Sequence, residues 1–170
     1  MWKLGKRIIK AGRVSETLNV SAEDVTVVGE LLHKNITRHF ARALAIRLVD
    51  AGSCNACELE INAMNNPFYN LERYGVGFVA SPRHADMLLV TGPVTKNMRE
   101  ALIKTYEAIP DPKLVVAVGD CAHCGGVFKD SYAIENGLLG IIPVTTVIKG
   151  CPPTPVQIIT GILQAIKCCN

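Results

Sequence analysis

Three short aliphatic runs, each followed closely by a loop with glycine and cysteine, constrain the fold of this chain more than any other feature. The runs are Leu44–Val49, Leu114–Val118 and Val144–Ile148. Each has the length of one buried strand, and segments with helical periodicity lie between them, as in a parallel sheet with right-handed crossovers. We therefore expect the α/β class, and within it a flavodoxin-like three-layer sandwich with a parallel sheet.

The remaining elements are predicted from the same patterns. Further strands are expected at Val76–Ala80 and Met87–Thr91, and helices at Glu58–Met64, Asn97–Ile109 and Thr154–Ile166. Thr154 and Pro155 are typical of a helix N-cap followed by proline at the first helical position. Ser21 could cap an earlier helix that continues through Val27–His39.

Composition excludes several classes of protein. Hydrophobic residues make up 49% of the 170 residues, yet no run approaches the roughly 20 apolar residues of a membrane-spanning helix. Seven cysteines, an odd number with metal-type spacing, argue against a secreted disulfide framework. We expect a protein that is cytoplasmic or bound peripherally at the cytoplasmic face of the cell membrane.

The N-terminal segment is basic and the rest of the chain is not. The net charge is +3, and five basic residues precede the first acid. They are Lys3, Lys6, Arg7, Lys10 and Arg13. On a helical wheel they share one side, so the segment is either an amphipathic helix for a membrane surface or a membrane-embedded partner, or a frayed basic tail. No nucleic-acid recognition motif accompanies the charge, so we expect no nucleic acid partner.

Four cysteines follow the predicted strands and should meet at one edge of the sheet. Cys54 and Cys57 come after the first run, Cys121 after the second and Cys151 after the third. The crevice beyond the carboxyl ends of parallel strands is where such folds bind ligands. Four thiolates suit an iron–sulfur cluster or zinc far better than magnesium or calcium.

The residues alone leave three chemistries open. An iron–sulfur cluster uses all four cysteines named above. A zinc site could use Cys54, Cys57, Cys121 and Cys124, but it leaves Cys151 without a role. A thioredoxin-type redox pair could use Cys54 and Cys57 alone.

Four segments make a family resemblance specific. They are residues 52–60 (GSCNACELE), 81–95 (SPRHADMLLVTGPVT), 119–126 (GDCAHCGG) and 150–153 (GCPP). In order and content these segments resemble the small subunits of membrane-bound, energy-converting NiFe hydrogenases, which are homologous to the cluster-bearing 20 kDa-type subunit of respiratory complex I. The paired cysteine spacing of Cys54 and Cys57 is closer to the hydrogenase branch than to complex I, whose cysteines are adjacent at this position.

The resemblance implies a role in a larger complex. It implies one 4Fe–4S cluster on Cys54, Cys57, Cys121 and Cys151, which passes electrons, ultimately from ferredoxin, to the catalytic site of a partner large subunit. A ferredoxin-type cluster subunit and membrane subunits complete the expected partners. The chain would thus be part of a multi-subunit oxidoreductase and not catalytic alone. Related complexes that reduce polysulfide or a quinone are the alternative.

The same resemblance suggests roles for a few polar residues and a division of the chain. Glu60 is a candidate proton relay, and Arg83 and His84 are expected near the cluster. Residues 1–40 would form a basic amphipathic or helical extension, and residues 41–170 the iron–sulfur-binding α/β domain.

Overall fold

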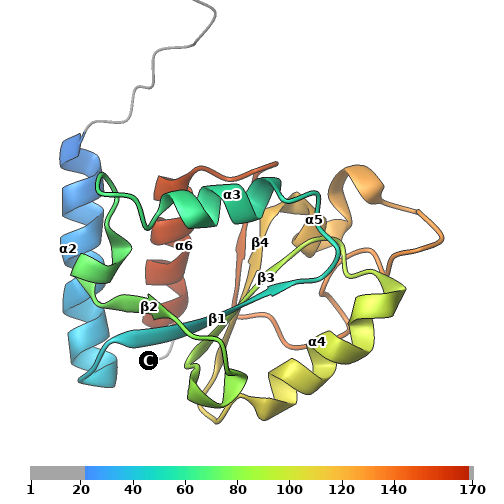
Figure 1. Cartoon of the computed structure of the whole chain (residues 1–170), viewed down its shortest axis with the longest axis horizontal. Coiled ribbons are helices and arrows are strands. Elements are labelled where there is room, and N and C mark those ends of the chain that lie inside the picture. The colour runs from blue at the N-terminus through green and yellow to red at the C-terminus, as the bar shows by residue number, and fades with distance from the viewer. Residues whose placement is uncertain (1–21, 169–170) are drawn as a thin grey trace, which may run out of the picture.

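The computed structural model describes residues 22–168 and contains a five-stranded parallel sheet with helices on both faces (Figure 1). The strands are β1 (Leu44–Asp50), β2 (Val76–Phe78), β3 (Met87–Thr91), β4 (Leu114–Val118) and β5 (Thr146–Ile148). Their order across the sheet is β2-β1-β3-β4-β5, which is the order of a flavodoxin-like doubly wound sheet. The predicted fold class is confirmed.

Five helices and three short 3₁₀ turns connect the strands in the described part of the chain. The helices are α2 (Ala22–Phe40), α3 (Ala56–Ala63), α4 (Lys96–Ala108), α5 (Gly119–Cys124) and α6 (Pro155–Lys167). The 3₁₀ turns are η1 (Leu71–Tyr74), η2 (Pro82–His84) and η3 (Gly126–Phe128). None of these helices is long and apolar enough to cross a membrane.

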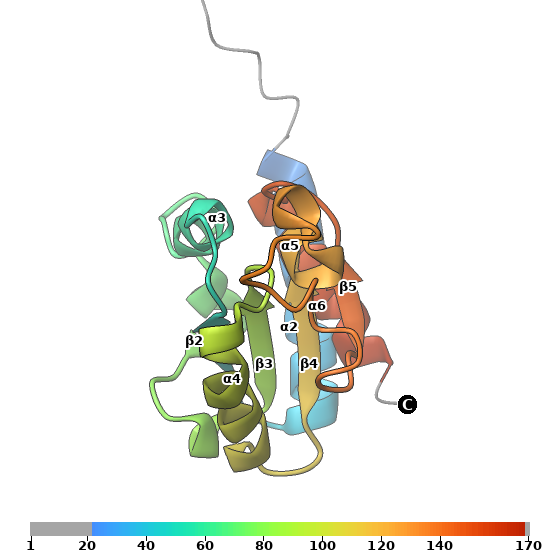
Figure 2. The ribbon, with the colours of Figure 1, turned by 90° about the vertical axis from the view of Figure 1, so that its right-hand side faces the viewer.

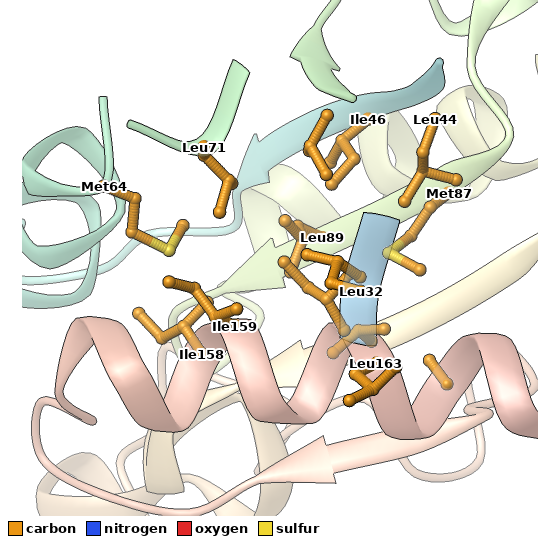
Figure 3. Packing of buried hydrophobic residues seen from close by; sticks show 14 of the residues in the cluster. Leu32, Leu44, Ile46, Met64, Leu71, Met87, Leu89, Ile158, Ile159 and Leu163 are labelled. Atoms are coloured by element: carbon orange, nitrogen blue, oxygen red, sulfur yellow. The ribbon is translucent and has the colours of Figure 1, made fainter. Parts of the chain in front are cut away.

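One face of the sheet is covered by α2, α3 and α6, and the larger of the two apolar clusters lies between them and the strands. Figure 3 shows Leu32 of α2 and Leu163 of α6 facing Leu89 of β3 in this cluster. Both helical residues are almost fully buried. Helix α2 is therefore packed into the same core as the sheet, although it lies within the residues that the sequence assigned to an extension.

The opposite face is covered by α4, α5 and the loop before β5. Leu102 of α4, Ala122 of α5 and Leu138 of the loop pack against Leu88 and Val115 of the sheet. Strands β3 and β4 lie between the two layers with every residue buried, which explains their uninterrupted apolar sequence.

At the amino-terminal edge of the sheet, a buried carboxylate joins three strands. The Asp86 carboxylate accepts a hydrogen bond from the backbone N–H of Ala45 and forms an ion pair with Arg42. The Asp86 backbone N–H donates to the Ala45 carbonyl, and the Asp86 carbonyl accepts from the Leu114 N–H. These contacts set the relative positions of β1, β3 and β4, and through them the positions of the loops at the other end.

Some predicted boundaries differ from the structure for identifiable reasons. Strand β5 begins only at Thr146, because Thr145 uses its N–H and its hydroxyl to bond the backbone of Val115. Helix α5 was not predicted, since six residues directly after a strand are too short for a periodic signal. The basic N-terminal cluster and Ser21 lie outside the described residues.

The expectation for Arg83 and His84 is wrong. Both are exposed side chains of η2, which lies beside α4 just before β3 begins. They are thus at the amino-terminal edge of the sheet, and the cysteine loops are at the carboxyl edge. The sequence places them before a strand, and residues before a parallel strand lie at the end opposite to residues after it.

Candidate metal centre

Three strand-to-helix junctions bring the four cysteines to the carboxyl edge of the sheet. They join β1 to α3, β4 to α5 and β5 to α6, and Figure 2 shows α3, α5 and the start of α6 gathered at this end. Cys54 and Cys151 lie between a strand and a helix, whereas Cys57 and Cys121 lie in the first turns of α3 and α5. Cys57 and Cys121 are buried, whereas Cys54 and Cys151 are exposed. The centre is therefore closed toward the core and open on its outer side.

The loop that carries Cys54 is ordered by a carboxylate at the end of β1. Asp50 Oδ1 accepts hydrogen bonds from the backbone N–H groups of Gly52 and Ser53, at 2.8 and 2.7 Å. The Ser53 hydroxyl accepts one from the Asn55 N–H at 2.9 Å and donates one to Glu58 Oε2 at 2.6 Å. These bonds surround Cys54 in the sequence and hold the turn that leads into α3.

The loops of Cys121 and Cys151 are joined directly to each other. The Asp120 N–H donates to the Gly150 carbonyl at 2.9 Å, and the Gly150 N–H donates to Asp120 Oδ1 at 3.0 Å. This reciprocal pair explains why two cysteines 30 residues apart share one site. Sequence inspection missed this role of Asp120, although its position next to Cys121 was visible.

Helix α6 begins just beyond Cys151, as the sequence predicted. Thr154 is the N-cap and Pro155 follows it, while Gln157 completes a reciprocal capping box. A helix N-terminus favours negative charge, so this arrangement suits an anionic group bound at the cysteines.

The thiols influence one another's protonation, which places them in one neighbourhood. Burial raises the pKa of the Cys57 thiol to about 12, and negative charge on nearby groups adds to the rise. Those groups are Glu58, Cys121, Cys54 and Cys151. Burial also raises the pKa of Cys121, against a hydrogen bond from the Val127 backbone that lowers it, and Cys151 and Cys54 raise it further. A thiol that ligates a metal binds as the thiolate, so metal binding would release these protons to solvent.

Two glycines leave room beside the sulfurs. A Cβ atom on Gly119 would lie 2.8 Å from Cys57 Sγ, and a Cβ on Gly126 would lie 2.8 Å from Cys121 Sγ. Both residues also have positive φ, at +87° and +51°. Because neither glycine has a side chain, the backbone can lie close to these two sulfurs. The space left beside them suits a bulky group held by thiolates.

The spacing of the donors bears on which metal group would fit. Within residues 22–168, no three His, Cys, Asp or Glu side chains stand close enough to hold one ion. A tetrahedral zinc site with Zn–S bonds of about 2.3 Å needs sulfurs about 3.8 Å apart. A cluster of several irons and sulfides lies between its cysteines and separates them further. Among the described residues, the four cysteines are therefore not arranged as a site for one tetrahedral ion.

Cys124 does not join the four cysteines. It is exposed, and its sulfur donates a hydrogen bond to the Asp120 carbonyl at 3.4 Å, within α5. It is not among the groups that raise the pKa of Cys57 or Cys121. The zinc set that includes Cys124 therefore has less geometric support than the set that includes Cys151.

The acid that is buried beside the cysteines is Glu58. Its side chain is 7% exposed, whereas Glu60 is half-buried. The family resemblance had pointed to Glu60. Which of two nearby acids on a short helix is buried depends on what the helix packs against, and sequence does not give this. The proton-relay role of Glu60 stays a prediction.

Comparison with known proteins places the chain among respiratory complex subunits. Residues 54–165 match the family described as NADH ubiquinone oxidoreductase, 20 kDa subunit. The protein belongs to this family. The match covers all four cysteines and every element from α3 to nearly the end of α6. The family resemblance seen in the sequence is confirmed.

Individual members of the 20 kDa subunit family show how close the relationship is. Formate hydrogenlyase subunit 7 of Escherichia coli is 41% identical over 132 residues, which are 78% of this chain and 52% of that protein. A Pyrococcus furiosus protein named "Probable membrane-bound hydrogenase subunit mbhJ" is 49% identical over 119 residues, 70% of this chain and 71% of that one. The chain thus spans about half the length of the E. coli relative and more of the archaeal one.

A solved structure is similar to this chain in both sequence and fold. A chain of the membrane-bound sulfane sulfur reductase, an archaeal respiratory membrane complex, is 35% identical and superposes with a TM-score of 0.67. The match covers 80% of this chain and 74% of that one.

Proposed function

We propose that this protein is the electron-transfer subunit of a membrane-bound, hydrogenase-like respiratory complex and carries one 4Fe–4S cluster on Cys54, Cys57, Cys121 and Cys151. The observation that carries the proposal is the convergence of four thiols from three loops around two glycines that leave room beside the sulfurs. Membership of the 20 kDa subunit family supports it.

Such a cluster, when bound, supplies reversible one-electron transfer. The chain would supply its position and surroundings. Cys57 and Cys121 would hold it from the buried side, and the Val127 N–H directs a hydrogen bond at the Cys121 sulfur. Hydrogen bonds to the sulfurs and partial burial are the means by which a protein sets the potential of such a centre.

The exposed side of the centre would face the partner large subunit. Three exposed apolar side chains belong to α3 and to η3, the elements that contain or follow Cys57 and Cys121. They are Leu59, Val127 and Phe128. Exposed apolar groups around a redox centre suit a protein interface that brings donor and acceptor close. Electrons would arrive from ferredoxin through a ferredoxin-type cluster subunit, and membrane subunits would hold the complex at the cytoplasmic face.

The test compares two cysteine variants. The full chain, prepared anaerobically with iron and sulfide, should bind about four irons per chain and show a visible charge-transfer band. Cys151→Ser should lose or degrade the cluster, while Cys124→Ser should keep it. Colourless protein with stoichiometric zinc, or a complete and normally reducible cluster in Cys151→Ser, would contradict the proposal.

A second terminal reaction is supported by one comparison. The structural similarity to a sulfane sulfur reductase chain favours reduction of sulfane sulfur as the alternative to proton reduction. The intact complex, supplied with reduced ferredoxin, should release either hydrogen or sulfide. In the same assay Glu60→Gln should slow turnover at unchanged iron content if Glu60 relays protons, and an unchanged rate would remove that role.

A further inference from the structure

The carboxylate of Glu58 is buried next to the cysteines with only part of its bonding capacity used. The side chain is 7% exposed, and Oε2 accepts the Ser53 hydroxyl at 2.6 Å. The second oxygen, Oε1, is buried and has no hydrogen-bond partner among the described residues. Burial of a carboxylate oxygen without a partner costs free energy, so the contact to Ser53 is the main compensation visible in the fold.

Through the Ser53 hydroxyl, Glu58 is linked to the backbone just after Cys54, while Asp50 binds the backbone just before it. The Ser53 hydroxyl accepts the Asn55 N–H at 2.9 Å, and the Ser53 N–H is bonded to Asp50 at 2.7 Å. Asn55 has a left-handed conformation, with φ of +71°, that this turn requires. Because Cys54 itself is exposed, these bonds are what holds its loop in place.

The charge of Glu58 also reaches the neighbouring sulfur. Glu58 follows Cys57 directly in α3, and both side chains are buried. A negative charge that acts on one sulfur of the centre acts in the same direction on any electron added there.

We propose that the Ser53–Glu58 pair is a positioning device that holds the Cys54 loop against the cluster and places a fixed negative charge beside it, which lowers its reduction potential. This inference rests on the proposed function, because it concerns the same cluster. Two different groups would account for the position of the loop and for the reduction potential. The hydrogen bond gives position, and the carboxylate charge gives the lower potential.

The experiment separates the two parts by substitution in the full, anaerobically reconstituted chain. Glu58→Gln keeps an oxygen that can accept the Ser53 hydroxyl but removes the charge. Its potential, measured by a redox titration followed by electron paramagnetic resonance at one fixed pH, should shift upward, with the rate of cluster loss to an iron chelator nearly unchanged.

Ser53→Ala keeps the charge but removes the hydrogen bond. Its cluster should be lost about tenfold to a hundredfold faster, as expected for one hydrogen bond to a charged group, at a potential close to that of the parent.

Two more variants make the result decisive. Glu58→Asp keeps the charge but shortens the reach to Ser53, so it should combine the parent potential with the faster loss seen for Ser53→Ala. Glu107→Gln removes an exposed acid on α4 and should change neither quantity.

An unchanged potential in Glu58→Gln together with an unchanged loss rate in Ser53→Ala would overturn the inference. If Glu58→Gln does not hold a cluster, parent-like loss rates in both Ser53→Ala and Glu58→Asp would overturn it instead. A parent chain that binds no cluster would contradict the proposed function, a result that is distinct from these.

Discussion

At the scale of single residues, the site depends on the glycines beside the sulfurs as much as on the cysteines themselves. A Cβ atom added to Gly119 would meet the Cys57 sulfur and the Gly150 carbonyl, so this glycine lies where the three strand-to-helix junctions meet. Gly126 has the same relationship to Cys121. A side chain at either position would fill space that a bound cluster and its ligands need.

Gly119→Ala should therefore lose the cluster, and Gly140→Ala should not. Both glycines have nearly the same positive φ, +87° and +88°, so alanine should cost about 1 kcal/mol of unfolding free energy at each. Only at Gly119 would the new methyl press on a sulfur, since nothing lies within 4 Å at Gly140. Iron content per chain measures the difference. Full iron content in Gly119→Ala would show that the close approach is not needed.

The pKa of Cys57 predicts a loss of stability of the metal-free chain in alkali. The folded pKa of about 12 lies above the ordinary value of 9.0, so the folded state keeps a proton that the unfolded state releases. The stabilisation is fully present below about pH 9 and declines as pH rises toward 12, by at most about 1.4 kcal/mol per pH unit. Urea unfolding under reducing conditions should show a smaller alkaline decline for Cys57→Ser than for the parent. Parallel declines would mean that folding does not raise the pKa of Cys57.

At the scale of elements, the site is held in place by the packing of α6 against β5. Gly161 of α6 lies against Ile148, the last residue of β5, only three residues before Cys151. The register of this contact sets the direction in which the chain leaves the sheet toward the third cysteine loop.

Gly161→Ala should destabilise the protein although alanine favours helices. The helix preference for alanine is worth about 1 kcal/mol, but the new Cβ would lie 2.3 Å from Ile148 Cγ1, an overlap that forces a shift costing about 1–3 kcal/mol or more. Gly77→Ala in β2 is the matched control, since nothing lies within 4 Å and its φ is unstrained. Thermal unfolding should show a lower midpoint for Gly161→Ala only. A raised midpoint would mean that α6 can move away from β5 without cost.

At the scale of the whole molecule, the two ends of the sheet have different tasks. The amino-terminal edge is closed by Asp86 and its bonds to the starts of three strands. The carboxyl edge is open and carries the exposed cysteines and apolar side chains. This polarity is what an electron-transfer subunit needs if its partner covers only one end.

Val127→Glu should weaken assembly with the proposed large subunit while the cluster remains. The side chain is 75% exposed and its substitution places a charge at the open edge, where it would have to be buried in the interface. Ala101→Glu adds the same charge to the exposed side of α4 and should have no effect. Co-purification of the complex from cells that express all subunits, with iron content measured in each, distinguishes the two. Equal yields would place the interface elsewhere.

Much of the fold was predictable because local sequence patterns determine its strands and helix ends. Uninterrupted apolar runs such as Leu114–Val118 suit only strands buried on both faces, and Thr154 followed by Pro155 is a local start signal for a helix. The position of each cysteine after a strand predicted its edge of the sheet, because all strands in a parallel sheet end on the same side. The proposed ligand set of Cys54, Cys57, Cys121 and Cys151 therefore came from sequence, together with the family resemblance.

What only the tertiary structure decided depends on contacts between segments far apart in the chain. The choice between Glu58 and Glu60 as the buried acid, the bonds that join Asp120 to Gly150, and the close approach of Gly119 to Cys57 all require two or three loops to be in place at once. Sequence patterns report the environment of a residue averaged along its own element. Burial and hydrogen bonding at the carboxyl edge are set instead by neighbours from other strands, which is why the shared edge of the cysteines could be predicted and the residues that surround them could not.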